Sequence, residues 1–140
     1  MKRLVILLLP FFMSFNTQAE GHQPYQEFGD YKVYFSVFNS SFIQPDIATA
    51  YKLTRGKDRA LVNIALVKKD GVGDTEGLAA NIEGFSQNLM QQRRNLDFME
   101  VNEQNAVYYL APLRFVNEEI LHFTIVVKTS DDSQPLEVKF

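Results

Sequence analysis

The sequence predicts an all-β protein that folds as an antiparallel sandwich of about seven or eight strands. Apolar and polar residues alternate in several short segments, which is typical of half-buried strands. Clusters of Gly, Asp, Asn and Ser separate these segments at the spacing expected of a sandwich or a barrel. No long helical pattern lies between them, so a parallel α/β sheet is disfavoured. An immunoglobulin- or fibronectin-like sandwich is the first choice, and a small closed β-barrel is the alternative.

The expected strands share period-two alternation of aromatic or β-branched residues. They cover residues 31–38, 60–69, 96–101, 106–113, 121–128 and 136–140, with shorter strands at 52–55 and around Ile82 and Phe85. Residues 86–95 are interpreted as a polar connection in a strand, turn, strand arrangement, since Gly84 and Ser86 weaken a helix. A helix over 88–95 is the alternative, because Leu, Met, Gln and Arg are good helix formers.

The first strand of this set is apolar on both faces. Val33 and Phe35 occupy one face, whereas Tyr34 and Phe38 occupy the other. A strand with one face in a sandwich core normally carries polar residues on its second face. The second face therefore needs a cover, which we expect from residues 42–51.

The segment 42–51 is predicted to pack on the first strand as a lid. Pro45 can begin a helical turn, and Ile47 and Tyr51 then lie one turn apart on its apolar side. An internal cover is favoured because large exposed apolar patches are uncommon on soluble monomers. The alternative is a groove for a sugar, a peptide or a partner protein. Its candidate binding residues are Tyr34, Phe38, Phe42, Ile47 and Tyr51.

The N-terminus has the layout of a secretory signal peptide. Lys2 and Arg3 precede an apolar run over 4–15, and small residues then lead to a cleavage site between Ala19 and Glu20. The alternative, a membrane anchor, needs about 20 apolar residues, which is more than this run provides. We expect an exported, periplasmic chain with no stable membrane insertion after cleavage. Its parts are then a polar lead-in over 20–29 and a single sandwich domain over 30–140.

Composition limits the classes of function. The chain has 140 residues and no cysteine, so neither disulfides nor a lipid attached to cysteine can stabilise or anchor it. Twelve Phe and six Tyr supply a core large enough for one domain. The net charge of −3 disfavours nucleic acid, and also an anionic membrane surface, as a partner.

Candidate catalytic and metal-binding residues are few. His22 lies in the lead-in, and His122 lies on the polar face of its strand with no nucleophile near it in sequence. The acidic pairs are Glu118 with Glu119 and Asp131 with Asp132, and both pairs fall in predicted turns, where burial that would shift a pKa is rare. We therefore expect no catalytic residue, no metal site and no cofactor.

Four stretches, 31–51, 61–71, 106–109 and 115–121, resemble a family of small periplasmic proteins of Gram-negative bacteria that is catalogued as domain of unknown function 4426. The resemblance implies a periplasmic sandwich and implies no activity. Two classes of function stay open. The first is a non-catalytic module that binds an envelope protein or peptide through a sheet edge or an aromatic face. The second is a small hydrolase or metal-dependent enzyme.

Overall fold

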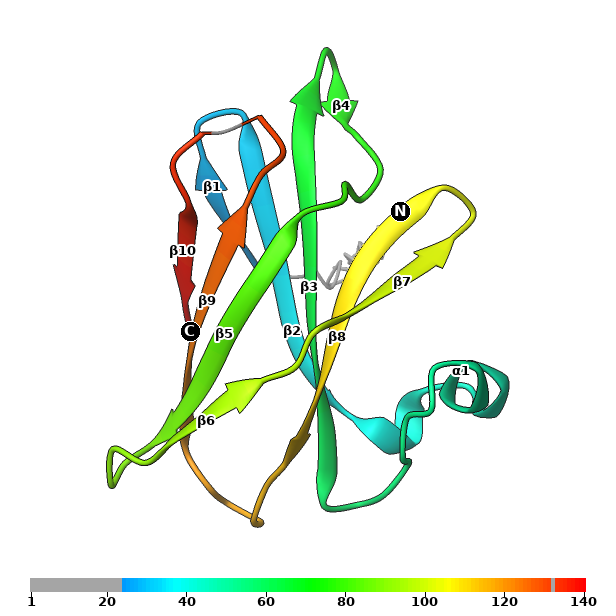
Figure 1. Ribbon diagram of the computed structural model, residues 1–140, viewed down its shortest axis with the longest axis vertical. Coiled ribbons are helices and arrows are strands. Elements are labelled where there is room, and N and C mark those ends of the chain that lie inside the picture. The colour runs from blue at the N-terminus through cyan, green and yellow to red at the C-terminus, as the bar shows by residue number, and fades with distance from the viewer. Residues whose placement is uncertain (1–23, 132) are drawn as a thin grey trace, which may run out of the picture.

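The computed structural model describes residues 24–131 and 133–140, which form two antiparallel sheets facing one another (Figure 1). The first sheet has the order β1-β2-β3-β8-β7, with β4 paired to the end of β3. Its strands are β1 (Tyr25–Phe28), β2 (Tyr31–Asn39), β3 (Arg59–Asp70), β4 (Gly73–Asp74), β7 (Met99–Glu103) and β8 (Ala106–Arg114). The second sheet has the order β10-β9-β5-β6. Its strands are β5 (Asn81–Asn88), β6 (Arg93–Leu96), β9 (Leu121–Lys128) and β10 (Leu136–Lys139).

The predicted antiparallel sandwich is confirmed. In the part of the chain that the structure describes, no strand of one sheet pairs with a strand of the other, so the closed barrel is wrong. Two short helical segments, η1 (Ser40–Phe42) and α1 (Pro45–Ala50), connect β2 to β3. Neither has the length and apolarity that crossing a bilayer requires, and the same holds throughout the described residues.

The main core fills the space between the sheets. Its buried side chains come from alternate positions of the facing strands: Val33, Val62, Ile64, Leu66, Ile82, Leu96, Tyr109, Ala111, Leu113, Phe123, Ile125, Val127 and Val138. The ring of Phe140 stacks between Phe35 of the first sheet, at 4.3 Å, and Phe123 of the second, at 4.9 Å. Phe140 and Phe123 also exchange both backbone hydrogen bonds. The last residue thus joins the two layers.

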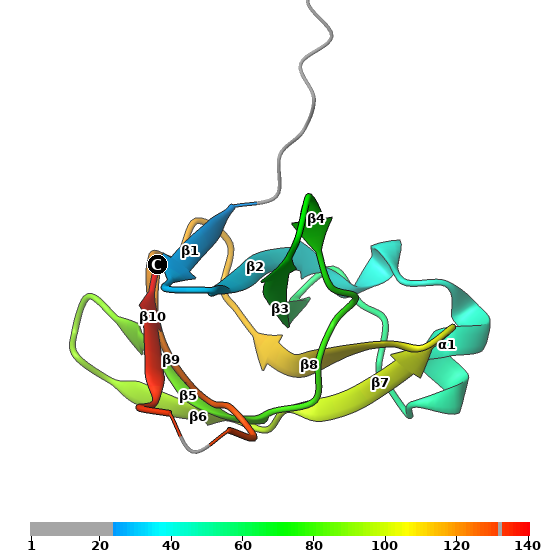
Figure 2. The same ribbon diagram turned by 90° about the horizontal axis from the view of Figure 1, so that it is seen from above.

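A second cluster lies on the outer face of the first sheet, beneath α1. Its buried members are Ala48, Leu53, Leu61, Val101 and Leu110. Figure 2 shows α1 outside the space between the sheets. The helical turn predicted within 42–51 is therefore confirmed, and Phe38, Ile43 and Tyr51 pack against this cluster.

Local hydrogen bonds hold the covering segment in place. The Asn39 side chain accepts from the backbone N–H of Ser41 at 2.9 Å. Ser40 is buried, and its hydroxyl donates to the carbonyl of Gly56 at 3.1 Å and accepts from the Gly56 N–H at 2.9 Å. These bonds join both ends of the excursion between β2 and β3.

Three local predictions differ from the structure. No strand forms at 52–55, because the N–H of Leu53 closes the end of α1 on the carbonyl of Ala48 at 2.8 Å and its side chain is buried in the second cluster. Strand β1 lies inside the predicted lead-in, where Gln and Glu obscure the alternation. The predicted strand 96–101 is two strands, because the chain leaves the second sheet after Leu96 and enters the first at Met99.

The segment 86–95 forms a hairpin rather than a helix. Strand β5 continues to Asn88, a turn follows, and β6 begins at Arg93. The strand, turn, strand arrangement is thus confirmed and the helix over 88–95 is wrong. The Asn88 side chain stabilises the turn, since its Oδ1 accepts from the N–H groups of Met90 at 3.0 Å and Gln92 at 2.9 Å.

Candidate binding site

A notch opens beside β5 because β6 covers only part of that strand. Strand β9 pairs with β5 along its whole length, Asn81–Asn88. Strand β6 pairs with it only over Gly84–Gln87 and then leaves for the first sheet. Among the described residues, 81–83 therefore have no ladder partner on the β6 side. A free strand edge of this kind carries backbone N–H and C=O groups that can pair with another chain.

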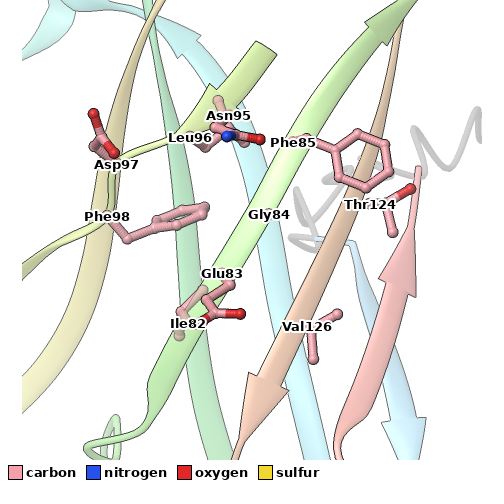
Figure 3. Close-up of a pocket in the computed structure, with 10 residues that line it drawn as sticks. All are labelled: Ile82, Glu83, Gly84, Phe85, Asn95, Leu96, Asp97, Phe98, Thr124 and Val126. Carbon is pink, nitrogen blue, oxygen red and sulfur yellow. The ribbon is translucent and has the colours of Figure 1, made fainter. Parts of the chain in front are cut away.

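The notch has a volume of about 600 Å³. Figure 3 shows its two walls. Asp97 and Phe98 come from the segment that crosses between the sheets, and the Phe98 ring points toward β5. The surface of the second sheet supplies the other lining residues, which are Ile82, Glu83, Gly84, Phe85, Asn95, Leu96, Thr124 and Val126. The lining therefore combines rings, carboxylates and neutral hydrogen-bonding groups.

The rim of the notch is acidic. Glu83 contacts Lys128 at 3.9 Å, but both side chains are about half exposed or more, so this ion pair contributes little. Asp97 is exposed and has no ion-pair partner in the described residues. At the end of the notch next to the β5–β6 hairpin, the guanidinium of Arg93 lies over the Phe85 ring at 4.4 Å. The notch thus offers two carboxylates next to a free backbone edge.

Glycine is required at position 84. A Cβ atom there would lie 2.5 Å from Cδ1 of Ile125 and 2.8 Å from the carbonyl oxygen of Thr124. Both atoms belong to the neighbouring strand β9, so a side chain at this position would push β5 and β9 apart. The close approach of these two strands sets the floor of the notch.

The start of β5 is positioned by Tyr109. This buried side chain donates from its hydroxyl to Glu100 at 3.1 Å and accepts from the backbone N–H of Ala80 at 2.8 Å. Burial, followed by the hydrogen bond to Glu100, raises the pKa of the Tyr109 hydroxyl, so the donor stays protonated. The bond to Ala80 fixes the chain just before the free edge begins.

The candidate binding residues of the lid do not form one groove. Phe38 and Tyr51 are partly buried against the second cluster, whereas Phe42 is 80% exposed. Tyr34 lies beside Tyr25 of β1, with ring centroids 5.2 Å apart. Ile47 is half-buried and lines a hollow shared with Tyr108. Their predicted role in binding stays a prediction.

The histidine and the paired acidic residues that the structure describes lie on the surface or in turns. His122 is exposed on β9 opposite Gln87, and His22 and Asp132 lie outside the described residues. Glu119 accepts from the backbone N–H of Val116 at 3.1 Å, within its own turn. Over 24–131 and 133–140, no three His, Asp or Glu side chains gather as a metal site would require.

Asp131 stabilises the loop between β9 and β10. Its carboxylate accepts hydrogen bonds from the hydroxyls of Thr129 and Tyr31 and from the backbone N–H of Ser133. These bonds, of which that from Thr129 is the largest cause, hold the pKa of Asp131 well below its usual range. The Asp131 carboxylate therefore stabilises this loop, and it is not among the residues that line the notch.

The fold and the notch define a small antiparallel sandwich with a free strand edge. The chain belongs to the family described as domain of unknown function DUF4426, whose model matches residues 25–140, and the predicted family membership is confirmed. A crystal structure of a DUF4426 family protein from Pseudomonas aeruginosa PAO1 is similar, with 32% identity and a TM-score of 0.73. The match covers 84% of this chain and 90% of that chain. No curated protein matches the sequence.

Sequence reasoning missed the notch. Glu83, Asp97 and Phe98 carry no motif, and the last two lie inside a stretch predicted as one continuous strand. A weak signal was present in Gly84, an isolated glycine in a strand pattern, which often marks a close backbone approach.

Proposed function

We propose that this chain is a non-catalytic binding module of the periplasm that takes up an extended segment of an envelope protein or peptide at the notch beside β5. The observation that supports this proposal is the incomplete pairing of β5, which β9 covers over Asn81–Asn88 and β6 only over Gly84–Gln87. An incoming extended segment would replace the missing part of β6 and hydrogen-bond to the free edge over 81–83.

Strand addition of this kind separates affinity from specificity. The main-chain hydrogen bonds provide affinity for any extended segment, and the side chains along the notch select among segments. The carboxylates of Glu83 and Asp97 favour a ligand with Lys or Arg at matching positions. The rings of Phe85 and Phe98 favour apolar side chains at the alternate positions, which face the sheet.

Export is part of the proposal and has its own test. We expect the protein recovered from the periplasm to begin at Glu20, because the apolar run and small residues before that position fit a cleaved signal peptide. N-terminal sequencing of the recovered protein measures this directly. Recovery of the chain with Met1 in a membrane fraction would contradict export with cleavage.

Binding is tested with a random library of short peptides selected against the chain beginning at Glu20. The variant is Glu83→Lys with Asp97→Lys, and we expect the selected peptides to bind it about tenfold more weakly or worse. The matched control is Glu27→Lys, because Glu27 is an exposed acid on the edge strand β1 and forms a similar weak ion pair, 3.7 Å from Lys69. Affinity for the control should stay unchanged.

Hydrogen exchange supplies the second readout. Strand addition predicts slower exchange of backbone amides over 81–83 when a selected peptide is bound, since new main-chain bonds protect them. If selection yields no peptide that distinguishes the double variant from the control, or if protection appears elsewhere and not on β5, the notch is not the binding site.

A further inference from the structure

Positive charge gathers at one end of the sandwich. We define the basic end as segments 37–59, 88–95 and 113–122, where β2, β5 and β8 finish and β3, β6 and β9 begin. It holds seven basic residues, Lys52, Arg55, Lys57, Arg59, Arg93, Arg94 and Arg114, against four acids, Asp46, Asp58, Glu118 and Glu119. Every arginine of the described residues is among them. The whole chain has the opposite balance, with 14 basic and 17 acidic residues.

The strand register brings these cations close together. Arg59 at the start of β3 lies directly opposite Arg114 at the end of β8, and like charges in this position destabilise a sheet. The two arginines and Lys52 line one hollow of about 270 Å³ that has no acidic lining residue. Asp58 lies 3.9 Å from Arg114, but both side chains of that pair are exposed, so the ion pair contributes little. Glu119 also lies near Arg114, in a neighbouring hollow. An anionic ligand would relieve this repulsion.

Exposed apolar side chains gather at the same end. The large hydrophobic residues most open to solvent in the described chain are Tyr25, Val37, Phe42, Val72, Leu89, Met90, Val116 and Ile120. All of them except Tyr25 and Val72 lie in the basic end. Figure 1 shows the β5–β6 turn, with Leu89 and Met90, and the β8–β9 loop, with Val116 and Ile120, projecting at the lower end of the molecule.

The two loops are neighbours across the end of the sandwich. One hollow is lined by Asn88 and Arg94 from the β5–β6 hairpin together with Glu119 from the β8–β9 loop. Another, of about 340 Å³, joins Val37 at the end of β2 to Phe115 and Leu121 at the two ends of that loop. The apolar tips and the arginines therefore belong to one surface rather than to scattered sites.

We infer that the basic end docks on the surface of a membrane that contains anionic phospholipid. Arginines attract the phosphate groups of the lipids, and the apolar tips enter the boundary between headgroups and acyl chains. The inference depends on both features together. Positive charge alone would also suit a soluble anion, and apolar tips alone would also suit a partner protein. The net charge of −3 is an average over the chain and does not describe this end. The chain lies on the membrane and does not cross it.

The test measures binding of the chain beginning at Glu20 to vesicles, by co-sedimentation. Omitting residues 1–19 removes the apolar N-terminal run, which would itself bind lipid, and leaves every described contact in place. Vesicles with phosphatidylglycerol should bind the protein at least tenfold more tightly than vesicles of phosphatidylcholine alone, and added salt should weaken the binding.

Two pairs of variants separate charge from apolar insertion. Arg93→Gln with Arg94→Gln should weaken binding about 25-fold, at about fivefold for each basic residue near the surface. Its control, Lys68→Gln with Lys69→Gln, changes two cations at the opposite end of β3 and should have no effect. Val116→Ser with Ile120→Ser should weaken binding about tenfold, whereas Val72→Ser, an exposed apolar residue at the opposite end, should not. All these residues are exposed, so melting temperatures should agree.

Three results would overturn the inference. The first is equal binding to neutral and anionic vesicles. The second is an equal loss of binding in a variant and in its control. The third is full competition by inorganic phosphate at matched ionic strength, which would mean that the hollow at Arg59 and Arg114 takes a soluble anion rather than a lipid.

Discussion

The main core and the second cluster are built on the same strand, and they differ in what covers them. Strand β3 directs Val62 and Ile64 into the space between the sheets, and directs Leu61 to the outer face. The main core is closed by a whole second sheet. The second cluster is covered by α1 and by the irregular segments on either side of it, which contribute Ile43 and Leu53. One strand thus supports two apolar clusters with very different covers.

Because of this difference, we expect the fold to open first at the second cluster. Local opening follows the number of buried contacts and backbone bonds that must break together. Opening the main core separates two sheets, whereas opening the second cluster requires only that a short covering segment detach. A side-chain acceptor is also buried there without a partner, since Oδ1 of Asn63 has none among the described residues. The predictions below test whether the two clusters are unequal in this way.

The largest effect is expected from Ile64→Ala in the main core. Ile64 is fully buried, so the lost contacts and the cavity should lower the free energy of unfolding by about 3 to 4 kcal/mol. Its matched control is Leu61→Ala, three residues away and equally buried in the second cluster, where the covering segment can settle into the space and the cost should be about 2 kcal/mol. Urea denaturation measures both. Equal losses would mean that the second cluster is as rigid as the first.

The next effect is expected from the lid itself. Ala48 is 5% exposed in the second cluster, so Ala48→Asp buries a carboxylate without a partner and should cost about 2 to 3 kcal/mol. Ile47 is only half-buried, so Ile47→Asp should cost about 1 kcal/mol or less. Amide exchange over 43–53 should accelerate in the Ala48 variant before that of β5 or β9. If Ile47→Asp is the more damaging change, the lid packs through a different face.

A smaller change of opposite sign is expected at Asn63. It lies on the outer face of β3, opposite Leu110 of β8. Asn63→Val removes the unpartnered acceptor and suits a strand, so it should stabilise the fold by about 1 kcal/mol. Asn63→Asp is the control, because a charge in the same place should destabilise. Thermal melting of both variants measures these changes in stability. If Asn63→Val lowers the melting temperature, the Asn63 side chain has a hydrogen-bond partner in solution.

The smallest effect depends on pH and concerns the rim of the main core. Tyr31 packs against that core and donates to Asp131, whose pKa these hydrogen bonds lower from the usual value of 3.8. The ionised group therefore stabilises the folded state above about pH 4, and this contribution declines as the pH falls below that value. Asp131→Asn should be less stable than wild type at pH 7, and the difference should shrink toward pH 3. A difference that is constant over this range would exclude the carboxylate as its source.

The sequence alone determined the elements whose signal is local. Alternation located β2, β3, β8 and β9, because a strand with one face in a core must repeat every two residues. The proline at 45 located the covering helix, because proline favours the start of a helix. The face that this helix covers was only partly predicted, since Phe38 of β2 packs beneath it but Tyr34 lies beside Tyr25 instead. The absence of helical patterns determined the antiparallel sandwich. None of these conclusions requires knowing which strands are neighbours.

The tertiary structure decided everything that depends on pairing between distant segments. The expected strand is interrupted at Asp97 because its first part, β6, pairs with β5, whereas its second part, β7, pairs with β8. This interruption opens the notch. The basic end joins arginines from three separate segments of the chain, so the net charge of −3 conceals it. Strand β1 forms because β2 is beside it, not because its own residues alternate. Local periodicity in the sequence shows which residues of a strand face a core. Which strands are neighbours, and which loops meet at one end of the sandwich, depends on contacts between segments that no short window of sequence contains.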